Sequence, residues 1–245
     1  MALIGEAGFF GKLPAYGDFI HRNVPNAAMT QWDEWLKSYV GATQERLGDN
    51  WLDVYLTSPI WRFCFSAGVL DEQSWAGILL PSVDRVGRYF PFTVLQALDP
   101  SIAPAAFITE QSAWYDAIEQ QALQALDGSL DAEALAEALA EPLPDSRLMY
   151  APQAAPSAEA GVVIDVTQDA LPMSSSLSHL LDVFIRERFV SHGVWQTNGS
   201  ERVEPCLFVV NALPAVSGGS AMMDGLWEDW EWCVPWRLSL GGEAQ

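Results

Sequence analysis

The segment Trp75–Leu98 reads WAGILLPSVDRVGRYFPFTVLQAL and predicts two strands joined by a polar loop. Trp75–Leu80 and Tyr89–Leu98 are apolar runs of the length that buried strands have in proteins. Pro91 interrupts the second run. Because proline cannot donate a hydrogen bond to a sheet ladder, it marks either the start of a strand or a strand at the sheet edge. Between the two runs, Pro81–Pro91 is predicted to form the loop.

The residues before this segment predict further strands and one long helix. Ala7–Leu13 is apolar and glycine-rich, which fits a first strand or a loop that enters one, and Trp61–Ser66 predicts another strand. A helix is predicted to begin at Pro25 and to end at Gly48. The apolar residues that recur in it at helical spacing are Met29, Trp32, Leu36, Tyr39, Val40 and Leu47. Trp51–Leu56 predicts a second, short helix.

The middle of the chain is predicted to be helical. Thr109 is expected to cap a helix that closes at Gly128, and Asp131 to cap a shorter helix that ends at Pro142. The apolar stripes of these helices are Trp114, Ile118, Ala122 and Leu126 in the first, and Leu135 and Leu139 in the second. Prolines then recur in an acidic, alanine-rich stretch, which is typical of a stiff, irregular connection.

A second group of elements is predicted after this connection. Gly161–Val166 predicts a short buried strand. Val190–Gln196 and Val203–Val210 predict a hairpin, because an Asn-Gly pair lies in the turn Thr197–Ser200 between them. A helix is predicted before the hairpin, and its buried face is expected to consist of Leu177, Leu180, Leu181, Phe184 and Ile185. Trp230, Trp232, Val234 and Trp236 alternate with polar or small residues. This alternation predicts a last strand with one aromatic face.

Strands and helices thus intermingle, which favours an α/β fold with a mixed sheet and helices on both faces. We predict one domain over residues 1–240, with lobes at about 1–141 and 161–240 and a Pro/Ala-rich connection at 142–160. Half of the 245 residues are apolar and 11 are Trp. A chain with this composition can bury a large, aromatic core.

The charge balance excludes some classes of partner. The chain has 32 Asp and Glu residues against 12 Lys and Arg residues, a formal net charge of -20. Such a chain repels nucleic acid and anionic membrane surfaces. It shows neither a secretory leader nor an apolar run long enough to span a membrane, and its scattered Cys64, Cys206 and Cys233 fit buried thiols in a reducing compartment. We therefore expect a cytoplasmic protein.

The motifs of common enzyme chemistries are missing. The sequence contains no Walker A pattern, no GxGxxG, no HExxH and no GxSxG. Ser82, Asp84 and His179 are present, but almost any chain of this length offers such a set. We therefore predict no catalytic residues, no metal site and no cofactor.

One local concentration of charge stands out. Basic residues are scarce, yet three of the twelve are Arg62, in the predicted strand Trp61–Ser66, and Arg85 and Arg88, in the Pro81–Pro91 loop. The other candidate residues are Lys12 and Asp18 in a glycine- and proline-marked segment, and Asp84 in the loop itself. Two interpretations stay open. The charges form ion pairs that fix the loop, or the guanidinium groups bind an acidic or phosphorylated partner.

The same segments resemble the type VI secretion-associated TagF family. The resemblance is carried by four blocks in the first hundred residues, which are Gly8–Phe19, Trp32–Leu36, Tyr55–Phe63 and Gly77–Pro91. It is looser at Gly193–Trp195 and Asn211–Pro214. The family's polar motif positions correspond to Lys12, Asp18, Arg62, Asp84, Arg85 and Arg88.

The resemblance implies a three-layer α/β/α sandwich and a post-translational repressor of type VI secretion. Its partner would be a protein of the secretion machine, above all the forkhead-associated scaffold protein. The family offers no catalytic residues to carry over. Two alternatives stay open, a hydrolase or phosphatase-like enzyme whose site is assembled from distant residues, and an assembly chaperone of the apparatus.

Overall fold

The computed structural model describes residues 5–140 and 173–237. Its centre is one seven-stranded sheet with the order β2-β1-β5-β4-β3-β6-β7. The strands are β1 (Gly8–Gly11), β2 (Ile20–Arg22), β3 (Trp61–Phe65), β4 (Ser74–Leu80), β5 (Phe92–Leu98), β6 (His192–Thr197) and β7 (Cys206–Asn211).

Every neighbouring pair in this sheet is antiparallel. The expectation of a mixed sheet is therefore wrong. It treated the helices between strands as crossovers that lead to parallel neighbours. Here β3, β4 and β5 follow one another as a meander, and the long excursions of the chain return to strands that run in the opposite direction.

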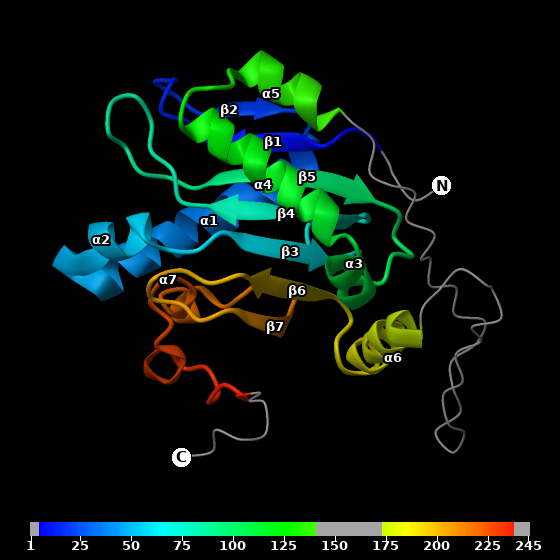
Figure 1. Cartoon of the computed structure of the whole chain (residues 1–245). Coiled ribbons are helices and arrows are strands. Elements are labelled where there is room, and N and C mark those ends of the chain that lie inside the picture. The colour runs from blue at the N-terminus through cyan, green and yellow to red at the C-terminus, as the bar shows by residue number, and fades with distance from the viewer. Residues whose placement is uncertain (1–4, 141–172, 238–245) are drawn as a thin grey trace, which may run out of the picture.

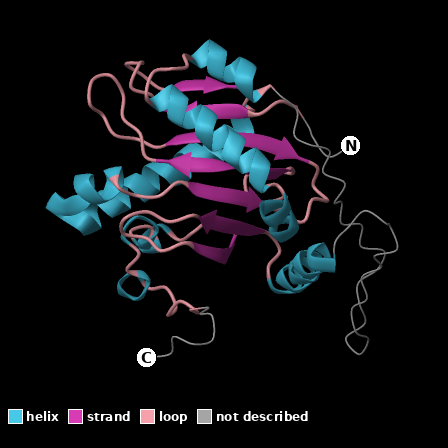
Figure 2. Ribbon diagram, in the orientation of Figure 1, coloured by secondary structure: helices cyan, strands magenta, loops and turns pink. Residues whose placement is uncertain are grey.

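Helices lie on both sides of the sheet (Figure 1). In that view α4 and α5 cross in front of the strands, whereas α1 lies behind them. The helices are α1 (Asn26–Leu47), α2 (Trp51–Leu56), α3 (Pro104–Glu110), α4 (Ser112–Leu126), α5 (Ala132–Leu139), α6 (Met173–Arg188) and α7 (Ala221–Asp224). Short 3-10 turns lie at Gly48–Asn50, Val216–Gly218 and Trp227–Trp230. Figure 2 shows the connecting loops in the same orientation.

The sheet separates two apolar clusters. Trp61, Phe63 and Phe65 of β3 point to the cluster that contains α1 and α2, whereas Cys64 points to the cluster that contains α4 and α5. All side chains of β3, β4 and β5 are buried. This explains why their sequences read as continuous apolar runs and not as an alternation.

Several elements begin and end where the sequence predicts. The long helix runs from the residue after Pro25 to Leu47, and Gly48 takes a φ of +53° that favours glycine. Asp131 caps α5, because its carboxylate accepts hydrogen bonds from two backbone N–H groups in the first turn. Strand β5 starts directly after Pro91 and lies between β1 and β4, so the proline marks a strand start and not an edge.

Other expectations are wrong. Thr109 lies within α3, where its hydroxyl donates to carbonyl groups one turn earlier, and α4 begins three residues later at Ser112. On α6, Ile185 is buried as predicted, together with Val183, but Leu177, Leu181 and Phe184 are exposed. The Trp-rich tail forms a 3-10 turn at Trp227–Trp230 and continues irregularly, with Val234 and Trp236 exposed.

The predicted hairpin of β6 and β7 joins the same sheet as β1 to β5. Its strands pair with each other, beginning at Thr197 and Cys206, and the loop between these residues contains the predicted Asn-Gly turn. Strand β6 also pairs with β3. The predicted strand Gly161–Val166 and the predicted connection at 142–160 lie outside the described residues. No helix within residues 5–140 and 173–237 has both the length and the apolar character to cross a membrane.

Candidate functional site

The loop between β4 and β5 is organised around the carboxylate of Asp84. Its Oδ1 accepts hydrogen bonds from the backbone N–H groups of Val86 at 3.0 Å and Arg88 at 2.9 Å. The N–H of Asp84 donates to the carbonyl of Arg88 at 3.0 Å, and Gly87 takes a φ of +86°. This one side chain therefore fixes the conformation of the turn.

Two cations lie against the other oxygen of this carboxylate. Oδ2 of Asp84 is 3.0 Å from Nζ of Lys12 and 2.7 Å from Nε of Arg88. Burial would raise the pKa of Asp84, but the hydrogen bonds from Arg88, Lys12 and the Val86 N–H hold that pKa well below its ordinary value. Asp84 is charged at neutral pH, so the three side chains carry one net positive charge.

The residues after β1 pack against this loop through their backbone. The carbonyl of Lys12 accepts a hydrogen bond from Oγ of Ser82 at 2.6 Å. The carbonyl of Tyr16 accepts from the N–H of Arg85 at 2.8 Å, and the carbonyl of Gly17 accepts from the guanidinium of Arg88. Residues 12–17 and 82–88 therefore form one rigid unit, which we call the double loop.

The outer surface of the double loop carries a free cation. The side chain of Arg85 is exposed and has no ion pair or hydrogen bond within the part of the chain that the structure describes. Next to it in the sequence, Val86 is 65% exposed, and Phe19 is 39% exposed. Asp18 is also exposed, and its carboxylate accepts a hydrogen bond from the backbone N–H of Phe19 at 2.8 Å. The surface thus combines a guanidinium group with apolar side chains.

Tyr55 of α2 attaches the double loop to the core. Its hydroxyl donates to the carbonyl of Ser82 and accepts from the N–H of the same residue, both at 2.9 Å. Tyr55 is 1% exposed, and burial raises the pKa of its hydroxyl despite the hydrogen bond to Ser82. A second tyrosine, Tyr16, accepts from the N–H of Ala132 at the start of α5, at 2.9 Å.

Arg62 lies apart from the double loop, on β3. Its Nε is 2.6 Å from Glu119 and its Nη2 is 2.6 Å from Asp116, both on α4. Its guanidinium also lies over the ring of Tyr115, at 5.5 Å from the centroid. Burial would lower the pKa of Arg62, but the two carboxylates raise it above its ordinary value. The side chain is 4% exposed, so this pairing holds α4 on the sheet.

A groove lies between these two charged clusters. It is a cavity of about 330 Å³ between α2, the C-terminal half of α4 and the ends of β3 and β4. Its apolar lining includes Pro14, Leu56, Ile60, Val83, Leu123 and Leu126. Pro14 and Val83 belong to the double loop, and Ile60 lies two residues before Arg62. Neighbours of both groups of predicted residues therefore line the groove.

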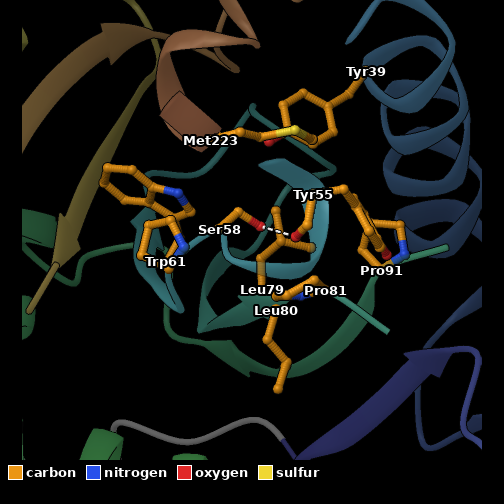
Figure 3. Close-up of a pocket in the computed structure, with 10 residues that line it drawn as sticks. Tyr39, Tyr55, Ser58, Trp61, Leu79, Leu80, Pro81, Pro91 and Met223 are labelled. Atoms are coloured by element: carbon orange, nitrogen blue, oxygen red, sulfur yellow. Dashed lines mark hydrogen bonds between the residues drawn. The ribbon is translucent and has the colours of Figure 1, made fainter. Parts of the chain in front are cut away.

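A second cavity behind the double loop is much smaller (Figure 3). It holds about 10 Å³ among Tyr39, Tyr55, Trp61, Pro91 and Met223. A volume of this size holds at most one water molecule. Within residues 5–140 and 173–237, no group of three or more His, Cys, Asp or Glu residues is placed to hold a metal ion.

The structure brings together only part of the predicted set. Lys12, Asp84 and Arg88 meet at one carboxylate, and Arg85 and Asp18 lie beside them without joining the ion pairs. Sequence reasoning missed Tyr55, which was assigned only to a short apolar helix. Its signal is a tyrosine among core residues, since a buried hydroxyl needs a hydrogen-bond partner.

Comparisons with known proteins give a consistent result. Residues 8–141 match the family model described as the TagF N-terminal domain, Type VI secretion system-associated. Among solved structures, the crystal structure of PA0076 from Pseudomonas aeruginosa PAO1 is 31% identical in sequence, with a TM-score of 0.74. This match covers 96% of the present chain and 99% of that chain. No curated protein matches the chain.

Proposed function

The chain belongs to the type VI secretion-associated TagF family, and from this premise we propose that it is a regulator that represses the secretion system by binding one of its proteins. The observation that carries the proposal is the exposed guanidinium of Arg85, which has no partner among the described residues and lies on a rigid loop. The backbone of Arg85 is already ordered by its hydrogen bond to Tyr16, so binding has to order only the side chain and not the loop.

The partner that we propose is the forkhead-associated scaffold protein of the machine. The guanidinium of Arg85 suits a carboxylate or a phosphate group on that partner. A repressor that prefers the inactive state of its partner needs only to be present in stoichiometric amount. The proposal therefore requires no catalytic residue, places the protein in the cytoplasm and treats the chain as a binding protein.

We also propose how the helices and the sheet are layered. The resemblance to the family implies a three-layer α/β/α sandwich. Two apolar clusters on opposite faces of the sheet, one with α1 and α2 and one with α4 and α5, support it. Such an arrangement leaves the strand ends, and the loops that follow them, as the surface on which a partner binds.

Calorimetric titration against the purified scaffold, in phosphorylated and unphosphorylated forms, tests the partner. We expect saturable binding that changes with phosphorylation, and an affinity that falls about tenfold or more in Arg85→Ala. Lys37→Ala is the matched control, because Lys37 is an exposed cation on α1 that pairs with Asp33 of the same helix. Undiminished binding by Arg85→Ala removes the loop from the interface, and absence of binding by the wild type removes this partner.

A secretion assay tests the direction of the effect. Deletion of the gene is expected to increase secretion if the protein is a repressor. Loss of secretion on deletion would instead identify an assembly chaperone. Complementation with Arg85→Ala is expected to leave secretion as high as in the deletion strain, whereas Lys37→Ala restores repression.

A further inference from the structure

The groove between α2 and α4 exposes leucine side chains on both of its walls. Leu56 of α2 is 50% exposed and Leu123 of α4 is 49% exposed, and both line the cavity of about 330 Å³. Leu52, one turn before Leu56, is 38% exposed. Single exposed leucines are normal on protein surfaces, but Leu56 and Leu123 converge on one concave site. The cavity is in the size range of pockets that bury a bound group.

The strands that end at the groove offer no backbone groups to an incoming strand. The groove lies at the ends of β3 and β4, and each of these strands already has a neighbour on both sides. The sheet edges are β2 and β7, away from the groove. A helix satisfies its own backbone hydrogen bonds and can pack one apolar stripe between two helical walls. The geometry therefore favours a helix over an extended peptide.

Besides Leu123, the α4 wall carries two carboxylates, those of Asp116 and Glu119. Asp116 and Glu119 share Arg62, so one negative charge of this trio is not balanced. Glu119 lies one helical turn before Leu123, on the same face of α4. Asp116 is 67% exposed, so its carboxylate is open to a cation.

We infer that this groove binds an amphipathic helix of the partner protein, one that inserts apolar side chains between Leu56 and Leu123 and presents lysine or arginine to Asp116 and Glu119. The inference rests on the proposed function, because it names the chemistry of the partner segment. Apolar contact supplies affinity at the centre of the groove, and the unbalanced carboxylates select a basic helix over an acidic one.

A pair of synthetic helical peptides tests this chemistry directly. Both carry leucine at positions i, i+4 and i+7, and they differ only in lysine or glutamate at the remaining exposed positions. Fluorescence anisotropy at about 0.15 M ionic strength, where long-range attraction is screened, measures their affinity for the wild-type protein. We expect the lysine peptide to bind and the glutamate peptide to bind about tenfold or more weakly.

The Leu56→Ser/Leu123→Ser double variant locates the binding site. It is expected to lower the affinity for the lysine peptide about tenfold or more. Leu177→Ser is the control, because Leu177 is an exposed leucine on α6. Equal affinity of the double variant and the wild type would mean that the peptide binds elsewhere on the acidic surface, and the inference fails. The inference also fails if neither peptide binds, or if the glutamate peptide binds with the same affinity as the lysine peptide.

Titration of the same proteins with the scaffold separates this inference from the proposed function. If the wild type binds the scaffold and the double variant does not, the groove is part of that interface. If both bind it equally, the proposed function stands and the groove inference is overturned for this partner. If the lysine peptide binds in the groove but the scaffold does not bind, the proposed partner is wrong and the groove assignment stands. Dimerisation that the double variant abolishes would overturn the inference in favour of a second copy of this chain.

Discussion

The ammonium group of Lys12 lies 3.0 Å from a carboxylate oxygen of Asp84, and this contact joins segments that are 72 residues apart in the sequence. The Lys12 side chain is 7% exposed and that of Asp84 is fully buried. The contact sets the relative position of the two halves of the double loop, which carries the exposed Arg85.

Lys12→Met removes the ammonium group while keeping a long apolar stem. We expect the free energy of unfolding to fall by about 1–3 kcal/mol, because a buried carboxylate loses one of its partners but keeps the others. Urea denaturation measures the change. Lys37→Met, at an exposed helical position, is the control and is expected to change stability by less than about 0.5 kcal/mol. A Lys12→Met loss as small as the control would contradict the structural role of the pair.

The lowered pKa of Asp84 predicts the sign of a pH effect. Because the pKa is lower in the folded than in the unfolded state, the charged form stabilises the fold at every pH above the unfolded value of about 4. That stabilisation is lost as the pH falls from about 4 toward the folded pKa. The urea midpoints of wild type and Asp84→Asn are therefore expected to differ by a constant amount above about pH 5 and to converge below about pH 4. A gap that widens in acid would show the opposite sign.

Tyr55→Phe removes one hydroxyl and leaves both backbone groups of Ser82 without that partner. The Ser82 carbonyl still accepts from the N–H of Phe90 at 3.1 Å, whereas the buried N–H of Ser82 loses its partner. We expect a loss of about 1–3 kcal/mol in the free energy of unfolding, the cost of one buried unsatisfied group. Hydrogen exchange is also expected to speed up at the amides of residues 82–88. Tyr89→Phe serves as the control, since the Tyr89 ring packs edge-on against Tyr55 at 6.1 Å. Equal exchange rates in the two variants would mean that Tyr55 does not hold the loop.

Arg62→Lys keeps the charge but not the geometry. One ammonium group cannot reproduce the planar fork with which Arg62 contacts Asp116 and Glu119 from two different nitrogens. We expect this variant to lose about 1–2 kcal/mol of stability in thermal or urea unfolding. Stability equal to that of the wild type would show that only the charge of Arg62 matters.

The local features of the fold could be predicted because single residues determine them. Pro25 and Gly48 bound a helix by backbone conformation alone, and Asp131 caps one by a hydrogen bond within three residues. The pairing of β3 with β6 could not be predicted in this way. It depends on which buried strands meet after a long excursion of the chain, and no local pattern encodes that choice.

Helix α6 shows how one polar residue can reverse a prediction. Apolar spacing alone places Leu177, Leu181 and Phe184 inside. In the structure the carboxylate of Asp182 is buried and accepts hydrogen bonds from the N–H groups of Ala105 and Ala106, both at 3.0 Å. These bonds satisfy the start of α3, and they orient α6 so that the leucines face outward.

The candidate site was predicted as a set of charges but not as an arrangement. The resemblance to the family and the scarcity of basic residues selected Lys12, Asp84 and Arg88, which meet in the structure. Neither the resemblance nor the scarcity of basic residues distinguishes Arg88, whose side chain is paired, from Arg85, whose side chain has no partner in residues 5–140 and 173–237. The difference arises from the direction of each side chain in a turn, which the sequence does not specify.

The pairing of β3 with β6 has a consequence for synthesis of the chain. Ser66 and His192, which are hydrogen-bonded where these strands meet, are 126 residues apart. At about 5–20 residues per second, the ribosome needs roughly ten seconds to supply the second strand after the first. During that time the apolar segment WRFCF of β3 has one open edge, which favours self-association of nascent chains. A fragment that stops at residue 141, where the family match ends, keeps that edge open permanently and is expected to aggregate when expressed alone.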